Sequence, residues 1–137
     1  MAREDFAKLG LSPTGFIAPA WLLSRPAEEA LRDLGFAYTT RLGSVLNLAR
    51  NTTFHSQSLV YSVRTHWRRT VSLGWNAFLY RRLRRAPLMR VGIHPPDLSH
   101  PSIWRQIKNH RARALEERGP MTYHDWTAAA AGQPAGR

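Results

Sequence analysis

The alternation of short apolar runs with amphipathic segments limits this chain more than any other feature. Four apolar runs are bounded by turn formers: residues 14–21, 36–40, 59–64 and 88–95. Three segments have helical spacing: residues 24–34, 65–85 and 99–118. A strand, helix, strand order with short connections is the unit of parallel α/β folds. We therefore predict an α/β chain with about four parallel strands and flanking helices.

The predicted helices differ in how clearly their ends are marked. Ser24 is typical of an N-cap, Pro26 of a first helical turn and Gly35 of a C-terminal stop. An earlier helix is expected to end at Gly10. For the long helix we expect an inward face made by five residues: Trp67, Val71, Trp75, Phe78 and Leu79. For the last helix the expected inward residues are Ile103, Trp104, Ile107, Ala114 and Leu115.

Two segments show no clear period. Residues 41–58 are polar, and we predict a loop there, with room for a short strand around 45–48. The end of the chain, 119–137, has no periodic apolar face and finishes in Gly and Pro. The expected organisation is therefore a folded part, 1–118, followed by a flexible C-terminal tail, 119–137.

The positive charge is concentrated in the middle of the chain. The formal net charge is +11, and ten arginines but no acidic residue stand between Asp33 and Asp97. Such a segment can bind polyanions, which leaves a nucleic-acid-binding module using Arg64 to Arg90 as an alternative function. Basic residues at a helix C-terminus also complement the helix dipole, so we favour a solvated helix end over a nucleic-acid partner.

The composition also restricts the compartment and the chemistry. No apolar run approaches the roughly 20 residues of a membrane span, and the N-terminus lacks the blocks of a signal peptide. We therefore expect a cytoplasmic protein without a membrane partner. The absence of cysteine excludes disulfides and thiolate metal sites.

Two predicted strands end in residues that can do chemistry. In parallel α/β folds, functional groups collect where a strand ends and the next loop begins. One strand end carries Pro19 and Trp21, and another, "GIHPPD", carries His94 and Asp97. A histidine there can act as a general acid near neutral pH, although one that only bonds to its loop would give the same spacing.

A metal site within this chain is poorly supported by its residue spacing. The only compact set of ligand types is His94, Asp97 and His100, and it straddles two prolines. Neither a phosphate-binding glycine loop nor a nucleophilic triad is present. We therefore predict no metal ligands in the chain.

Four blocks in order resemble the C-terminal half of polysaccharide deacetylase-like proteins, the NodB-homology superfamily. They are "GFIAPAWLLS", "LGFAYTT", "LVYSVR" and "APLMRVGIHPPDLSHPSIW". The resemblance is closest to an uncharacterised bacterial branch of predicted deacetylases and runs from about residue 5 to residue 118. Where the wider family usually has Arg two residues before the motif proline, this chain has Ile17.

The resemblance implies a distorted (β/α) barrel, of which this chain is a part, and a hydrolase acting on carbon–nitrogen bonds other than peptide bonds. It implies zinc or another divalent metal in the complete domain, a proton-donating role for His94 and a substrate-binding role for Pro19 and Trp21. Asp97 is a candidate support for His94. The substrate class would be an N-acetylated carbohydrate.

The metal ligands that the resemblance implies lie upstream of everything in this sequence. The family's paired aspartates and its His-x-x-x-His motif have no counterpart here. We therefore expect the chain to be inactive by itself and to need an N-terminal half or a second copy as partner. A non-catalytic interaction protein that recruits a strand at an open sheet edge is a further alternative.

Overall fold

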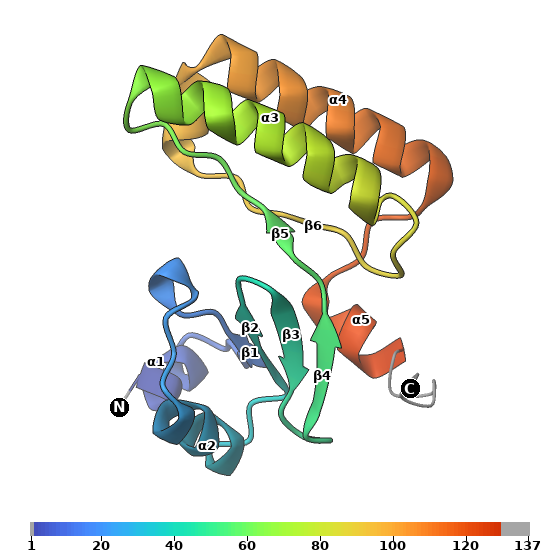
Figure 1. Cartoon of the computed structure of the whole chain (residues 1–137). Helices are drawn as coiled ribbons and strands as arrows, with labels where there is room; N and C mark the ends of the chain where they lie inside the picture. The colour runs from blue at the N-terminus through green and yellow to red at the C-terminus, as the bar shows by residue number, and fades with distance from the viewer. Residues whose placement is uncertain (1, 130–137) are drawn as a thin grey trace. The chain divides into compact units, whose positions relative to one another are not determined.

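The computed structural model describes residues 2–129. By compactness the chain divides into two units. Unit 1 combines the chain up to His55 with the segment that begins at Met121, and unit 2 is Ser56–Pro120. Figure 1 labels the elements of both units.

Unit 1 is a small mixed sheet with helices. Its elements, in chain order, are α1 (Ala2–Lys8), β1 (Gly15–Phe16), the 3-10 turn η1 (Pro19–Trp21), α2 (Arg25–Asp33), β2 (Tyr38–Arg41), β3 (Ser44–Asn47), β4 (Thr52–His55) and α5 (Tyr123–Ala129). The strand order is β1-β2-β3-β4. The first pair is parallel and the next two pairs are antiparallel, as expected for two hairpin connections.

Helix α2 begins and ends where its residue types predict. The Ala27 N–H donates to the Ser24 hydroxyl at 3.4 Å, and Pro26 lies in the first turn. Gly35 takes the left-handed conformation, with φ 75°, just beyond the helix. Leu31 is buried against the sheet residues Leu46 and Leu48. This helix therefore connects the parallel strands β1 and β2 as predicted.

Residues 41–58 are not a loop, because the segment contains most of a three-stranded meander, and the short strand expected around 45–48 is present as β3 (Ser44–Asn47). β3 pairs with β2 on one side and with β4 on the other, with Val45 opposite Thr40 and Phe54. All residues of β3 are buried, so the strand shows no alternation of apolar and polar residues. β3 therefore lacks the sequence signal of a half-buried strand, and in β4, whose burial does alternate, Phe54 is the only apolar residue.

Helix α5 lies inside the segment for which we predicted a flexible tail, so that prediction missed an ordered element. The Asn47 amide donates to the Thr127 carbonyl at 3.3 Å, and the Phe54 and Trp126 rings meet edge to face at 6.2 Å between centroids. These contacts attach α5 to the sheet of unit 1. The prediction for residues 130–137 lies outside the described part of the chain.

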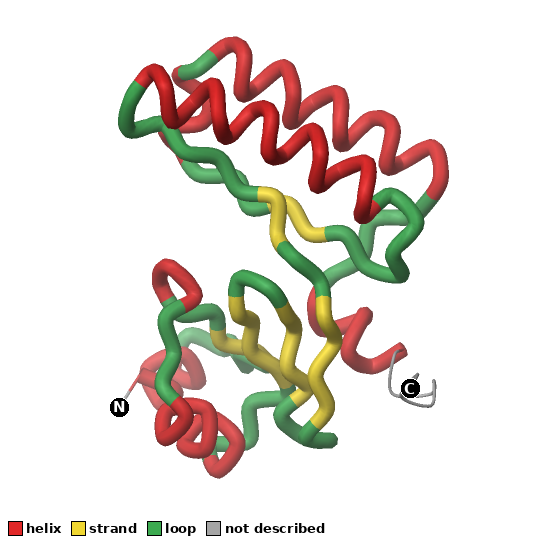
Figure 2. The backbone as a smooth tube through the Cα atoms, in the orientation of Figure 1, coloured by secondary structure: helices red, strands yellow, loops and turns green. Residues whose placement is uncertain are grey.

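Unit 2 consists of two long helices and a small parallel sheet. Its elements are β5 (Ser58–Leu59), α3 (His66–Leu83), β6 (Arg90–Val91), the 3-10 turn η2 (Pro95–Ser99) and α4 (Pro101–Glu117). β5 pairs with β6 in parallel, Ser58 opposite Arg90. Helices α3 and α4 run beside each other (Figure 1). Figure 2 shows the same backbone with helices in red and strands in yellow.

Two apolar clusters form the core of unit 2. Leu59 of β5 packs with Leu79 and Tyr80 of α3, while Tyr61 packs with Ile103 and Ile107 of α4. The inward face predicted for the last helix is thus confirmed at Ile103 and Ile107, where burial is nearly complete. Leu115, the outermost residue of that predicted face, is exposed.

The inward face predicted for the long helix is wrong. Trp67, Val71, Trp75 and Phe78 are all more than half exposed, and only Leu79 of the predicted set is buried. The buried residues of α3 are instead Ser72, Asn76, Leu79 and Tyr80. Trp67 and Trp75 are therefore not core residues, whereas Trp104 packs partly buried against the Tyr61 cluster.

The α/β class predicted from the sequence is confirmed. Each predicted strand corresponds to an observed one, and they pair in parallel as β1 with β2 and β5 with β6. The described residues place these pairs in two separate sheets, and β3 and β4 add antiparallel pairing. None of the helices between residues 2 and 129 combines the length and apolar character of a membrane span.

Candidate functional site

The turn that follows β6 holds His94 and Asp97 together. The chain leaves β6 at Val91, and His94 is the residue at which η2 starts. The His94 N–H donates to Asp97 Oδ2 at 2.8 Å, and the Asp97 N–H donates back to the His94 carbonyl at 2.9 Å. Pro95 and Pro96 between them fix the backbone for a tight turn. The carboxylate therefore caps the turn and orients its first residue.

The His94 ring is placed where it can exchange a proton. Its side chain is 53% exposed, whereas that of Asp97 is 1% exposed, and Nδ1 lies 3.9 Å from Asp97 Oδ2. The buried carboxylate therefore lies beside a ring that is itself half exposed. The arrangement can support general-acid chemistry at a half-exposed ring.

Tyr61 connects this turn to the core of unit 2. Burial raises the pKa of the Tyr61 hydroxyl to about 12, and the negative charge of Asp97 contributes to the same shift. The hydroxyl therefore stays protonated through the neutral range. It lies 3.4 Å from Nδ1 of His110, a buried histidine of α4.

The turn that follows β1 contains the other predicted site residues, Pro19 and Trp21. Within η1, Ala20 has φ 53° and Trp21 has φ 57°, both in the left-handed region. Residues with a Cβ avoid this region, at a cost of roughly 1–3 kcal/mol each. Pro19 is exposed and Trp21 is half-buried. Strain of this kind is typical of turns that present a side chain to a ligand.

The four residues predicted for a site form two pairs. Pro19 and Trp21 belong to unit 1, and His94 and Asp97 belong to unit 2. Within each pair the structure brings the residues together in one short turn.

The residue set His94, Asp97 and His100 does not form a metal centre. Asp97 is used to cap its own turn. Within residues 2–129, no three His, Cys, Asp or Glu side chains lie close enough together to hold a metal ion. The zinc that the family resemblance implies therefore finds no ligand set in the described chain.

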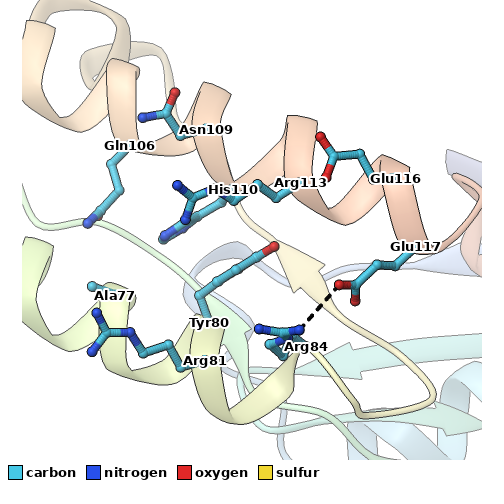
Figure 3. Close-up of a pocket in the computed structure, with 10 residues that line it drawn as sticks. All are labelled: Ala77, Tyr80, Arg81, Arg84, Gln106, Asn109, His110, Arg113, Glu116 and Glu117. Atoms are coloured by element: carbon cyan, nitrogen blue, oxygen red, sulfur yellow. Dashed lines mark hydrogen bonds and ion pairs between the residues drawn. The ribbon is translucent and has the colours of Figure 1, made fainter.

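Sequence reasoning missed a cavity between α3 and α4, with a volume of about 530 Å³ (Figure 3). Its lining comes from α3, from Arg84 directly after α3, and from α4: Ala77, Tyr80, Arg81, Arg84, Gln106, Asn109, His110, Arg113, Glu116 and Glu117. The volume falls in the range of small-molecule sites.

Two stacked rings are the buried part of this cavity lining. The rings of Tyr80 and His110 are nearly parallel, with an interplanar angle of 5° and 4.2 Å between centroids. Burial lowers the pKa of His110 below its usual 6.5, and the nearby positive charge of Arg113 lowers it further. His110 is therefore neutral at pH 7. With Nδ1 facing the Tyr61 hydroxyl, the tautomer that carries the proton on Nε2 is favoured.

Only part of the charge around the cavity is paired. Arg84 Nη2 lies 3.5 Å from Glu117 Oε1, and both side chains are about half exposed. Arg81 and Arg113 make no ion pair with any carboxylate among the described residues. After the Arg84–Glu117 pair is set aside, Glu116 is the remaining carboxylate of the lining, so the lining has a positive excess.

One sequence signal pointed toward this cavity. His110 follows Ile103 and Ile107 at helical spacing, so it could have been added to the inward face of the last helix, although it was not predicted there. The residues of α3 that line the cavity depend on the rotation of α3, which was predicted incorrectly. The sequence prediction therefore included none of the residues of this site.

Comparison of the chain with protein-family models, with curated proteins and with solved structures gives no match. The chain's own residues offer two candidate sites, the His94–Asp97 turn and the α3–α4 cavity.

Proposed function

We propose that the chain is the C-terminal portion of a polysaccharide deacetylase-like domain and that His94 protonates the departing amine. The observation that carries the proposal is the placement of His94. It follows a parallel strand, its ring is 53% exposed, and Nδ1 lies 3.9 Å from the buried Asp97 carboxylate. A general acid needs a ring that a leaving group can reach and that its neighbours hold in position.

The fold supports the same proposal. β1, α2 and β2 form one strand, helix, parallel-strand unit, and β5, α3 and β6 form another. Such units build (β/α) barrels. Within the described residues β5 and β6 pair only with each other, so each has an open edge that a further strand could cover. A part of a distorted barrel has such open edges.

The reaction assigned to the complete domain is hydrolysis of an N-acetyl group. Water adds to the acetyl carbonyl carbon, the carbon–nitrogen bond breaks, and the nitrogen takes a proton as it leaves. The products are acetate and a free amine. In this proposal His94 supplies that proton, and Asp97 orients His94 by accepting from its backbone N–H at 2.8 Å. Such acid catalysis contributes about 10²- to 10⁴-fold to a rate.

The described residues do not supply activation of the attacking water. No metal-ligand group is present between residues 2 and 129, and we assign no step to a metal. The proposal therefore includes an N-terminal half or other partner that brings this function. Pro19 and Trp21 have the proposed role of contacting the N-acetylated carbohydrate, since their strained turn carries a proline and an aromatic residue two positions apart.

Complementation tests this proposal. The full chain is mixed with the N-terminal half of an active polysaccharide deacetylase that carries the paired aspartates and the His-x-x-x-His motif, and acetate release from chitin oligosaccharides is measured with zinc present. We expect no release from either part alone and release from the mixture. His94→Ala should lower the rate about 10²-fold or more. His66→Ala, an exposed histidine at the start of α3, is the matched control.

Two outcomes would contradict the proposal. Equal rates with His94→Ala and wild type in the mixture would remove the proton-donor role. Acetate release by the isolated chain that disappears on His94→Ala would show that the chain contains a water-activating centre of its own.

A second candidate function, nucleic-acid binding, is favoured by one observation on α3. Trp67, Trp75 and Phe78 are exposed on a helix that also carries exposed arginines, and the Arg68 guanidinium lies 5.3 Å from the Trp67 ring centroid. Aromatic rings beside basic groups stack on single-stranded bases. The exposed rings therefore add support for nucleic-acid binding, for which the sequence offered only the positive charge.

Binding to a fluorescent single-stranded oligonucleotide, measured across salt concentrations, tests the second candidate. If it holds, affinity falls steeply with salt, and neutralising Arg81, Arg82, Arg84 and Arg85 together flattens the dependence. Trp75→Ala should weaken binding roughly fivefold or more, as expected for one lost base stack. Weak binding that depends little on salt and is unchanged by either set of substitutions would contradict nucleic-acid binding.

A further inference from the structure

The α3–α4 cavity has features of a ligand site that the proposed deacetylase function does not use. Its volume is about 530 Å³, and its lining comes from two helices of the same unit. The His94–Asp97 turn is not part of the lining. Any ligand of this cavity is therefore separate from the proton-transfer role of His94.

We propose that this cavity binds a small organic oxyanion, a phosphate or carboxylate group, held between Arg81 of α3 and Arg113 of α4. Both residues line the cavity from opposite walls, as Figure 3 shows. Neither makes an ion pair with a carboxylate of the described chain. Guanidinium groups offer paired N–H donors that match phosphate and carboxylate oxygens.

The charge balance favours an anion over a cation. Arg84 is paired with Glu117 at 3.5 Å, which leaves Arg81 and Arg113 against Glu116. The chain as a whole has a formal net charge of +11, so the surrounding field also attracts anions. A ligand with one or two negative charges would neutralise the remaining excess.

The same balance favours a small anion over a polyanion. Glu116 stands on the cavity lining, and its charge would repel an extended phosphate backbone that passes along it. A small molecule with a single oxyanion group presents less negative charge to Glu116. The cavity volume of about 530 Å³ is also that of a small-molecule site.

The walls of the cavity are held in place before any ligand binds. The Gln106 side chain of α4 donates to the Leu73 carbonyl of α3 at 3.1 Å. Arg118, beyond the end of α4, donates to the carbonyls of Arg84 and Ala86 beyond the end of α3. Buried stacking of Tyr80 on His110 joins the helices between these points. Preorganised walls reduce the ordering cost of binding.

His110 serves as a local reporter for the test. Its ring is on the cavity lining, and its pKa is lowered by burial and by Arg113. An anion held by Arg113 would favour the imidazolium form, so binding should raise the pKa of His110 and shift its ring-proton resonance. The His66 resonance, from an exposed residue outside the cavity, should stay unchanged.

The experiment uses the full chain, with inorganic phosphate, glucose 6-phosphate, gluconate and uncharged glucose as separate probes. Binding is measured by calorimetry and by the His110 resonance. We expect saturable binding of charged probes and none of glucose; the stronger of glucose 6-phosphate and gluconate identifies phosphate or carboxylate as the preferred group. The double variant Arg81→Gln with Arg113→Gln should lose at least about tenfold in affinity.

The control is the double variant Arg82→Gln with Arg111→Gln. It removes the same charge from exposed arginines of the same two helices that do not line the cavity, and its affinity should stay within about twofold of wild type. Equal losses in both double variants would reduce the effect to general electrostatic attraction and overturn the proposal. A His110 resonance that does not shift at saturating phosphate would also overturn the proposal. The single variant Arg81→Gln repeats the test if the double variant fails to fold.

Discussion

The two strand, helix, strand units of this chain have the same order of elements but hold their helices by different interactions. In unit 1, the Arg41 guanidinium of β2 donates to the buried Glu28 carboxylate of α2 at 2.7 and 2.6 Å. In unit 2, the buried Asn76 amide of α3 donates to the Val60 carbonyl beyond β5 at 2.8 Å. The helix of unit 1 is held by an ion pair, and the helix of unit 2 is held by the hydrogen bond of a neutral amide.

The difference also determines which face each helix turns outward. In α2 the apolar residue Leu31 faces the sheet. In α3 the polar residues Ser72 and Asn76 take inward positions, because the Ser62 N–H donates to the Ser72 hydroxyl at 3.0 Å and Asn76 reaches Val60. The tryptophans of α3 are left on the exposed side. Buried polar side chains that hydrogen-bond to a neighbouring segment can therefore turn a helix so that its apolar residues are exposed.

The largest expected effect comes from removing the amide of unit 2. Asn76→Leu leaves the Val60 carbonyl without its donor in a site where Asn76 is fully buried. We expect the free energy of unfolding of unit 2 to fall by about 2–3 kcal/mol. Urea unfolding, followed by hydrogen exchange of amides in residues 56–120, measures the change.

The matched control for this variant is Asn109→Leu. Asn109 lies exposed on α4 in the same unit, and its replacement should change stability by less than about 0.5 kcal/mol. If Asn76→Leu were as stable as this control, the amide would not be the interaction that holds α3 in its rotation.

Breaking the ion pair of unit 1 should have a smaller effect. Glu28→Gln keeps the shape of the side chain and removes its charge, but Arg41 is 49% exposed and can be hydrated instead. We therefore expect a loss of about 1 kcal/mol in the stability of unit 1. Thermal and urea unfolding in low salt measure it, and about 1 M salt should shrink the difference from wild type.

Glu29→Gln controls for the charge change, since Glu29 is the exposed neighbour in the same helix. A loss equal to that of Glu28→Gln would mean that only helix charge, and not the contact with Arg41, had been removed.

The smallest expected effect is a difference in pH dependence between the units. The folded-state pKa of His110 is lowered below 6.5, so its stabilising contribution is fully present above pH 6.5 and is lost as pH falls through the lowered value. Hydrogen bonding to Glu28 raises the pKa of Arg41, so acidification leaves that guanidinium charged. Between about pH 7.5 and 5.5, unit 2 should lose more stability than unit 1.

Hydrogen exchange resolved by unit measures this difference, and His110→Gln should reduce the slope in unit 2. An unchanged slope in that variant would assign the pH dependence to other groups of unit 2.

Local patterns were sufficient for several parts of the fold. The Ser24 cap and the Gly35 stop bounded α2 correctly, because caps depend on residues within one turn. The same holds for the His94–Asp97 turn, whose two residues are three positions apart and contact each other directly. β4 was missed because Phe54 is the only apolar residue among its four, so its alternation of burial is not an alternation of apolar and polar residues.

The sequence by itself determined the α/β class, the positions of four strands and three helices, and the pairing of His94 with Asp97, because each depends on neighbours along the chain. Only the tertiary structure decided the rotation of α3 and the cavity it forms with α4. A helical wheel ranks faces by apolar content, whereas the free energy here also includes the hydrogen bonds of Ser72 and Asn76 to the segment after β5. Those partners lie 10 to 16 residues away, and their contact exists only once the chain has folded.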